Sequence, residues 1–80
     1  MRKSIHTKAE ATLRALLRDA REKANLTQHE LAKRLKKPQS FVAKYETGER
    51  RLDIIEFVVI TRAIGADPAK LLKSMIAEGF

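Results

Sequence analysis

The chain contains no cysteine and no tryptophan, and only 5% of its residues are aromatic. The absence of cysteine excludes a disulfide framework and a thiolate metal site. Only two histidines are present, His6 and His29, and they lie far apart in the sequence. Because zinc sites usually need three or four ligands, this pattern predicts no bound metal and no cofactor.

Long apolar runs are also missing from the chain. No segment approaches the roughly 20 apolar residues that a membrane-spanning helix needs. Residues 1–7 are basic but lack an apolar run, so they do not have the form of a signal peptide. These absences favour a location in the cytoplasm.

Positive charge is abundant. The 80 residues, which suffice for a single domain, carry 17 Lys and Arg against 10 Asp and Glu, a net charge of +7. Such an excess indicates an anionic partner or serves solubility. Charge alone does not separate nucleic acid from a membrane surface, so the arrangement of the residues has to decide.

Helix starts and ends are marked clearly along the chain. Candidate capping boxes mark three starts, at Thr7/Glu10, Thr27/Glu30 and Asp53/Glu56, and Asp67-Pro68 marks a fourth. Residues able to adopt the left-handed conformation mark three ends, at Asn25, Gly48 and Gly65. Pro38 interrupts the chain between two short apolar segments. These signals predict an all-α fold, with helices over residues 8–24, 28–35, 39–46, 54–64 and 68–77.

Apolar residues recur with the period of an α-helix, and we expect them to form one core. On the first three helices the inward-facing candidates are Leu13, Leu17, Ala20, Ala24, Leu31, Ala32, Leu35, Val42 and Tyr45. On the last two they are Ile54, Phe57, Val58, Thr61, Ile64, Leu71, Leu72 and Met75.

The second and third predicted helices are separated by only three residues, Lys36, Lys37 and Pro38. Such a short turn forces the two helices to cross at a steep angle. Ala32 lies midway along the first of them, where a small side chain allows the next helix to approach closely. This combination predicts a helix-turn-helix.

Residues 26–35 read Leu-Thr-Gln-x-Glu-Leu-Ala-x-x-Leu, and residues 39–50 read Gln-Ser-x-Val-x-Lys-Tyr-Glu-x-Gly-x-Arg. This pattern resembles the lambda-repressor-like (Cro/repressor, XRE-type) helix-turn-helix family over about residues 13–72. The resemblance implies a compact five-helix domain that binds double-stranded DNA, a role as a transcriptional regulator such as a repressor, and a homodimer on a two-fold-symmetric operator. The chain departs from the family pattern at the turn, with Lys36 for glycine and Pro38 for Ser or Thr, and again at Leu52, where proline is frequent.

The resemblance implies that the helix over 39–46 lies in the major groove with its N-terminal side chains at base edges. The Gln39 amide can pair with adenine, Ser40 can bond several bases, and Lys44, one turn further on, can reach guanine or a phosphate. Phe41 is either a contact to a thymine methyl group or a buried residue. For Gln39 and Ser40 the alternative role is helix capping next to Pro38.

Phosphate contacts position a domain on DNA without reading its sequence. The candidates are Thr27, Gln28, Lys37, Arg50 and Arg51. Gln28 resembles the family's phosphate-contacting glutamine, whereas capping alone also explains Thr27. The three basic residues flank the predicted reading helix, although a charged run can equally be a solvated surface. Arg2 and Lys3 are candidates for a minor-groove arm within residues 1–7, with disorder as the alternative.

Arg21 and Glu46 lie on otherwise inward helical faces. In the family that the chain resembles, the matching residues form a partly buried salt bridge between the first and third helices. We therefore expect an Arg21–Glu46 ion pair that fixes the angle at which Gln39 and Ser40 are presented.

The fourth helix is more apolar than a monomer requires. One face packs inward, which leaves Ile55, Val59 or Ile60 partly exposed, and the segment 68–80 adds Met75, Ile76 and Phe80. Exposed apolar patches often mark protein interfaces. We expect a homodimer through the last two helices, the alternative being that Ile76 and Phe80 fold back on their own core.

Other functions fit the sequence less well. Catalysis is not expected, because no nucleophile–base pair, glycine-rich phosphate loop or ligand cluster is present. Membrane-surface binding is disfavoured because the apolar helix faces are needed for the core, and RNA binding because exposed aromatic residues are few. An antitoxin-type protein-interaction module that also binds DNA remains an alternative, with a toxin or a polymerase as a possible protein partner.

Overall fold

The computed structural model describes residues 7–80, which form five α-helices and no strand. The helices are α1 (Lys8–Lys23), α2 (Gln28–Leu35), α3 (Gln39–Thr47), α4 (Ile54–Ile64) and α5 (Pro68–Ala77). Every predicted helix is present, and each boundary lies within one residue of its expected position. Residues 1–6, which include Arg2 and Lys3 of the candidate arm, lie outside the described part of the chain.

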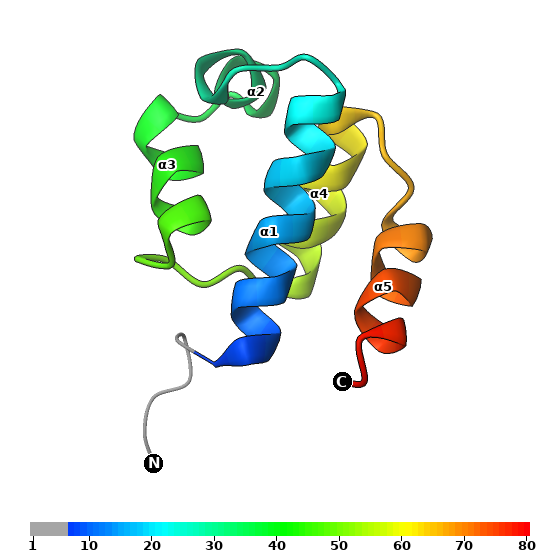
Figure 1. Ribbon diagram of the computed structural model, residues 1–80. Coiled ribbons are helices and arrows are strands. Elements are labelled where there is room, and N and C mark those ends of the chain that lie inside the picture. Colours follow the sequence, from blue (N-terminus) through cyan, green and yellow to red (C-terminus); the bar gives the residue numbers. More distant parts are fainter. Residues whose placement is uncertain (1–6) are drawn as a thin grey trace.

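In the arrangement of the helices, α1 and α4 lie in the middle of the molecule, with α2 and α3 to one side and α5 to the other (Figure 1). A single core joins them. Its buried side chains come from the first four helices and are Leu17, Leu31, Ala32, Val42, Tyr45, Phe57, Ile60 and Ile64. Helix α5 contributes no fully buried residue and covers the core through the partly buried Leu71. The reading-helix candidate α3 is therefore fixed against the core by its inward face.

The helix starts follow the capping signals, with one difference. At α2 and α4 both halves of the capping box are formed, by Thr27 with Glu30 and by Asp53 with Glu56. At α1 the Thr7 hydroxyl accepts a hydrogen bond from the Glu10 backbone N–H, but the Glu10 carboxylate is used elsewhere. The carboxylate pairs instead with Arg51 at 2.8 Å, so an ion pair with a residue distant in sequence takes the place of the second hydrogen bond of the capping box.

The buried face of α4 differs from the one predicted from sequence. The buried residues are Phe57, Ile60, Thr61 and Ile64, with Ile60 only 1% exposed. The prediction that Ile60 lies at an interface between subunits is therefore wrong. The reason is that α4 turns this face toward α2, whose Arg34 donates a hydrogen bond of 2.8 Å to the carbonyl of Ala63. The same rotation exposes Ile54 and Val58, which the sequence places in the core.

Three other residues depart from the predicted core in a smaller way. Ala24 is exposed because it is the C-terminal cap of α1, and Leu72 is 41% exposed on α5. Met75, a candidate both for the inward face of α5 and for an interface, is half-buried.

Candidate nucleic-acid interface

The turn between α2 and α3 is built without the residues that usually form it. Lys36 adopts the left-handed conformation, with φ 58°, and Pro38 is the N-cap of α3 without a side-chain hydrogen bond. The Lys37 N–H donates to the carbonyl of Ala32 at 3.0 Å, which closes the end of α2. Ala32 itself is 2% exposed, so its small side chain allows the two helices to pack closely. The helix-turn-helix geometry is thus retained despite both departures.

Helix α3 has one apolar and one polar face. Val42 and Tyr45 are fully buried against the core. The exposed residues Ser40, Lys44 and Thr47 follow one another at intervals of four and three, which places them on the opposite face of the helix. Thr47 was not among the sequence candidates, although its spacing from Ser40 and Lys44 carries the same signal as theirs. The outward surface of α3 is therefore polar along its whole length.

Gln39, at the start of α3, is held by a chain of hydrogen bonds that leads back to α1. Its Nε2 donates to Gln28 Oε1 at 2.8 Å, and Gln28 Nε2 donates to Glu46 Oε1 at 2.9 Å. Glu46 in turn accepts two hydrogen bonds from Arg21, from Nε at 2.8 Å and from Nη2 at 3.1 Å. We call these four residues the Arg21–Gln39 chain. It joins the residue expected at base edges to one expected at phosphate.

The ion pair at the inner end of this chain is well shielded from water. The side chains of Arg21 and Glu46 are 9% and 3% exposed. Arg21 Nη1 also donates to the carbonyl of Leu26 at 2.7 Å, so the guanidinium ties together α1, the α1–α2 loop and α3. Hydrogen bonding to Glu46 raises the pKa of Arg21 above its usual value, and burial opposes this shift. The ion pair implied by the family resemblance is thus present, with a bidentate geometry.

Phe41 does not face outward with Ser40. Its half-buried ring packs edge-on against Tyr45, with 5.7 Å between ring centres. Two cations lie near the same ring: Lys37 Nζ is 5.5 Å and Arg50 Cζ is 4.8 Å from its centre. The ring therefore lies between the turn before α3 and the loop after it.

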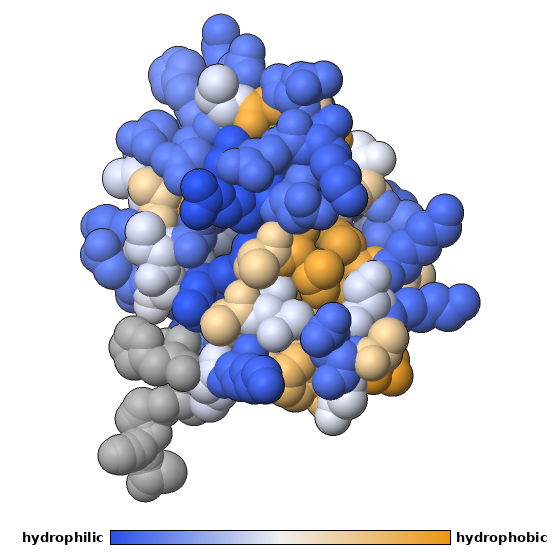
Figure 2. All heavy atoms as spheres, in the orientation of Figure 1, coloured by the Kyte–Doolittle hydropathy of each residue, from blue (hydrophilic) through white to orange (hydrophobic). Residues whose placement is uncertain are grey.

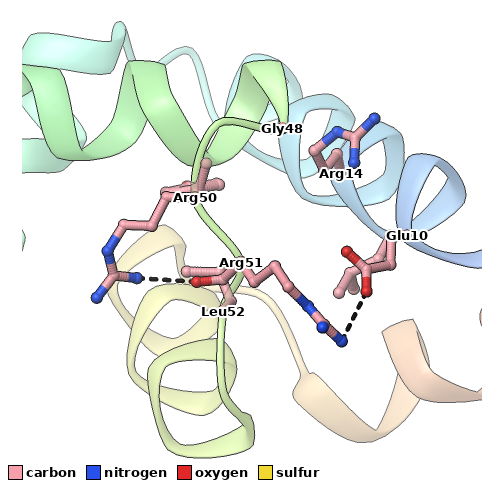
Figure 3. Close-up of a pocket in the computed structure, with 8 residues that line it drawn as sticks. Glu10, Arg14, Gly48, Arg50, Arg51 and Leu52 are labelled. Carbon is pink, nitrogen blue, oxygen red and sulfur yellow. Dashed lines mark hydrogen bonds and ion pairs between the residues drawn. The ribbon is translucent and has the colours of Figure 1, made fainter. Parts of the chain in front are cut away.

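Arg50 and Arg51 are adjacent in sequence but leave the loop in opposite directions (Figure 3). Arg50 makes two hydrogen bonds to Glu56, at 3.1 and 2.7 Å, and Arg51 pairs with Glu10. Hydrogen bonding from Arg50 lowers the pKa of Glu56 below its usual value. The two arginines thus lie on different sides of the loop rather than forming one cluster.

The other phosphate candidates lie at the start of α2. The Thr27 hydroxyl accepts from the Glu30 N–H at 3.0 Å and so serves as a cap. Gln28 is half-buried, and its amide is part of the Arg21–Gln39 chain. The N-terminus of α2 and its amide N–H groups nevertheless present the favourable end of a helix dipole to an anion.

These features agree with similarities to known proteins. Residues 17–71, more than half of the chain, match the family described as helix-turn-helix. The chain belongs to this helix-turn-helix family. It is similar to an XRE-family-like protein from Pseudomonas syringae pv. tomato str. DC3000, with 50% identity and a TM-score of 0.89 over 95% of this chain and 93% of that chain.

The clp gene regulator ClgR from C. glutamicum has a similar fold, with a TM-score of 0.79. It is 21% identical to this helix-turn-helix protein, and the similarity covers 94% of this chain and 97% of that chain. No curated protein matches the chain. The match to the family identifies the protein as an XRE-type, DNA-binding helix-turn-helix protein of the transcription-regulator class.

Two further observations concern the described residues of this helix-turn-helix protein. Within residues 7–80, no three His, Cys, Asp or Glu side chains come together in a way that would hold a metal ion. None of the five helices is long and apolar enough to cross a lipid bilayer.

Exposed apolar side chains lie on α4 and toward the C-terminus, outside the outward face of α3. On α4, Ile55 is 71% and Val59 is 51% exposed, and toward the C-terminus Ile76 is 67% and Phe80 is 49% exposed. One hydrophobic area is also visible in Figure 2, over the region between α1 and α5, whereas the end of the molecule that holds α2 is largely hydrophilic. The outward face of α3 is thus polar, and the exposed apolar side chains lie outside it, although Ile55 and Val59 line one pocket with Lys37 and Phe41 at the flank of α3.

Proposed function

We propose that the protein is a transcriptional repressor that binds a two-fold-symmetric operator as a homodimer, with α3 in the major groove. The observation that carries this proposal is the polar outward face of α3, formed by Gln39, Ser40, Lys44 and Thr47. A helix fits the major groove, which is about 12 Å wide, and polar side chains near its N-terminus reach the base edges there.

Gln39 is the leading candidate for reading a base. One of its amide N–H groups is used by Gln28, which leaves its carbonyl oxygen and its second N–H available. This is the donor and acceptor pair that matches adenine N6 and N7. Because Gln28 restrains the Gln39 amide, the glutamine loses less side-chain entropy on binding than a free one would. Ser40, Lys44 and Thr47 extend the same surface along the groove.

Phosphate contacts are proposed for Thr27 and Gln28 at the start of α2 and for Lys37, Arg50 and Arg51 around α3. Arg50 and Arg51 already have carboxylate partners, Glu56 and Glu10. A phosphate therefore has to compete with these exposed or partly exposed pairs. Such pairs contribute about 1 kcal/mol or less to stability, so a phosphate can displace the carboxylate at a small cost in free energy.

A homodimer is proposed through the exposed apolar residues Ile55, Val59, Ile76 and Phe80, together with the half-buried Met75. A dimer places two reading helices about 34–36 Å apart, one turn of DNA. Sedimentation that finds only monomers at high micromolar concentration would exclude this dimer while leaving DNA binding intact. The same apolar residues support the second candidate, an antitoxin-type module that binds another protein.

Selection of bound duplexes from a random pool, followed by salt titration, tests the proposed function. We expect one preferred, two-fold-symmetric sequence and a linear fall of log affinity with log salt concentration. Gln39→Ala should relax the preference at one base pair by about 1–3 kcal/mol, whereas Arg51→Ala should weaken all duplexes alike. Equal binding to the selected and scrambled duplexes would contradict sequence-specific recognition.

A further inference from the structure

We propose that Phe41 is a positioning residue, whose ring holds Lys37 and Arg50 together as a clamp for DNA phosphate on one flank of α3. The inference rests on the proposed DNA-binding function and assigns Phe41 a role other than base contact. Both cationic groups lie within 5.5 Å of the same ring centre. Lys37 precedes α3 and Arg50 follows it, so the ring joins the two ends of the reading helix.

The negative face of an aromatic ring attracts cations at such distances. Two like charges that share one ring repel each other, and a carboxylate compensates for this repulsion. Glu56 accepts two hydrogen bonds from Arg50, and Lys37 also helps to lower the pKa of Glu56. The Glu56 carboxylate therefore lies in the field of both cations, as the phosphate would on binding.

The position of the Phe41 ring is fixed by its packing against the core. It packs edge-on against Tyr45, which is fully buried. Phe41 also lines a pocket of about 180 Å³ together with Leu35, Lys37 and Glu56. Because the core fixes the orientation of the ring, the ring positions the flexible side chains of Lys37 and Arg50, and these side chains do not position the ring.

The test compares Phe41→Leu, which removes the ring, with Phe41→Tyr, which keeps it. The probes are the duplex obtained by selection and a scrambled duplex of equal length. We expect Phe41→Leu to weaken binding to both duplexes alike, by about two- to thirtyfold, as the removal of one or two exposed cation–π interactions implies. The slope of log affinity against log salt should become shallower, by about 0.9 for each phosphate that the variant no longer neutralises. Phe41→Tyr should stay close to the unmodified protein.

A double-mutant cycle separates positioning from simple packing. If Phe41 acts through Lys37, the losses in Phe41→Leu and Lys37→Gln should not add, whereas those in Phe41→Leu and Lys33→Gln should add. Lys33 is a matched control because it is an exposed lysine on α2. Additive losses in both cycles, or unchanged affinity in Phe41→Leu, would overturn the proposal. A changed preference at a single base pair would also overturn it, because the ring would then read a base.

The free protein provides a readout that does not depend on DNA. The Lys37 side-chain methylene protons should show an upfield ring-current shift by NMR, and Phe41→Leu should abolish it. Absence of this shift from the unmodified protein would contradict the inference directly. If the shift is present but no duplex binds, the proposed DNA-binding function is wrong. The ring then still contacts Lys37, but the clamp does not serve to bind DNA. If DNA binds normally and Phe41→Leu has no effect, only the present inference fails.

Discussion

Replacing the buried ion pair between Arg21 and Glu46 by methionine tests how the reading helix is braced. Arg21→Met leaves the Glu46 carboxylate, which is almost completely shielded, without its cationic partner. Glu46→Met leaves the Arg21 guanidinium with a hydrogen bond to the carbonyl of Leu26 and a 3.9 Å contact to the exposed Glu22. Breaking a buried pair in this way costs about 3–5 kcal/mol. A domain of this size has a free energy of unfolding of about 4–12 kcal/mol, so each single variant should be severely destabilised.

The double variant should lose much less than the sum of the single losses, because neither charge is then left uncompensated. We expect a coupling free energy of about 2–3 kcal/mol, measured by urea denaturation followed by far-UV circular dichroism. A stabilising osmolyte keeps the single variants measurably folded, provided that all four proteins are measured in the same solution.

The exposed pair between Arg18 and Glu22 is the matched control. Its side chains are 62% and 54% exposed and lie one turn apart on α1. Its coupling should be about 0.3–0.5 kcal/mol and should disappear at high salt, whereas that of the buried pair should persist. Equal coupling in the two pairs, or coupling of Arg21 with Glu46 that vanishes in salt, would refute the reasoning.

Three other predictions concern stability. Lys36→Gly should raise the free energy of unfolding by about 0.5–1 kcal/mol, because Lys36 has φ 58° and glycine adopts this conformation without strain. As a comparison, Asn25→Gly, at φ 60°, should raise the free energy of unfolding by less, since asparagine tolerates the left-handed conformation. Tyr45→Phe should be neutral or stabilising by up to about 1 kcal/mol in urea denaturation, because the buried Tyr45 hydroxyl finds no hydrogen-bond partner within residues 7–80; a clear loss of stability would show that this hydroxyl is satisfied. Hydrogen bonding from the Thr27 backbone lowers the pKa of Glu30 below its usual value of 4.5, so the unfolded state binds the proton more readily and stability should fall as the pH drops below that value. Glu30→Gln should reduce this acid dependence, and an unchanged dependence would contradict the assignment.

Much of the fold could be predicted because its signals are local. Thr27 with Glu30, and Asp53 with Glu56, define helix starts through groups only three residues apart, and Gly65 defines an end through its own backbone. The buried face of α4 was predicted less well. The helix is apolar on several sides, so its own sequence does not distinguish Ile60 from Val58. Which of these two residues is buried depends on the packing of α2 against α4, and this contact joins parts of the chain that are distant in sequence.

In the candidate site, too, some features follow from local sequence and others depend on long-range packing. The positions of Gln39, Ser40 and Lys44 on α3 follow from helix periodicity, and Thr47 could have been found in the same way. The partners of Arg50 and Arg51 could not, because each is a carboxylate on a different helix. The hydrogen bond between Gln28 and Gln39 also depends on the crossing angle of α2 and α3, which the turn sequence constrains but does not specify.

The Arg21–Gln39 chain suggests why a buried ion pair is used where apolar residues would also fill the space. Apolar replacements of buried ion pairs are often neutral or stabilising, so the pair is not explained by stability alone. Glu46, however, also accepts the hydrogen bond that orients Gln28, and Gln28 accepts the one that orients Gln39. Methionine at both ends of the pair would preserve packing but remove the acceptor for Gln28. We therefore expect the double variant to discriminate its operator from a scrambled duplex less well than its stability implies, because Gln39 would meet the base with an unrestrained amide.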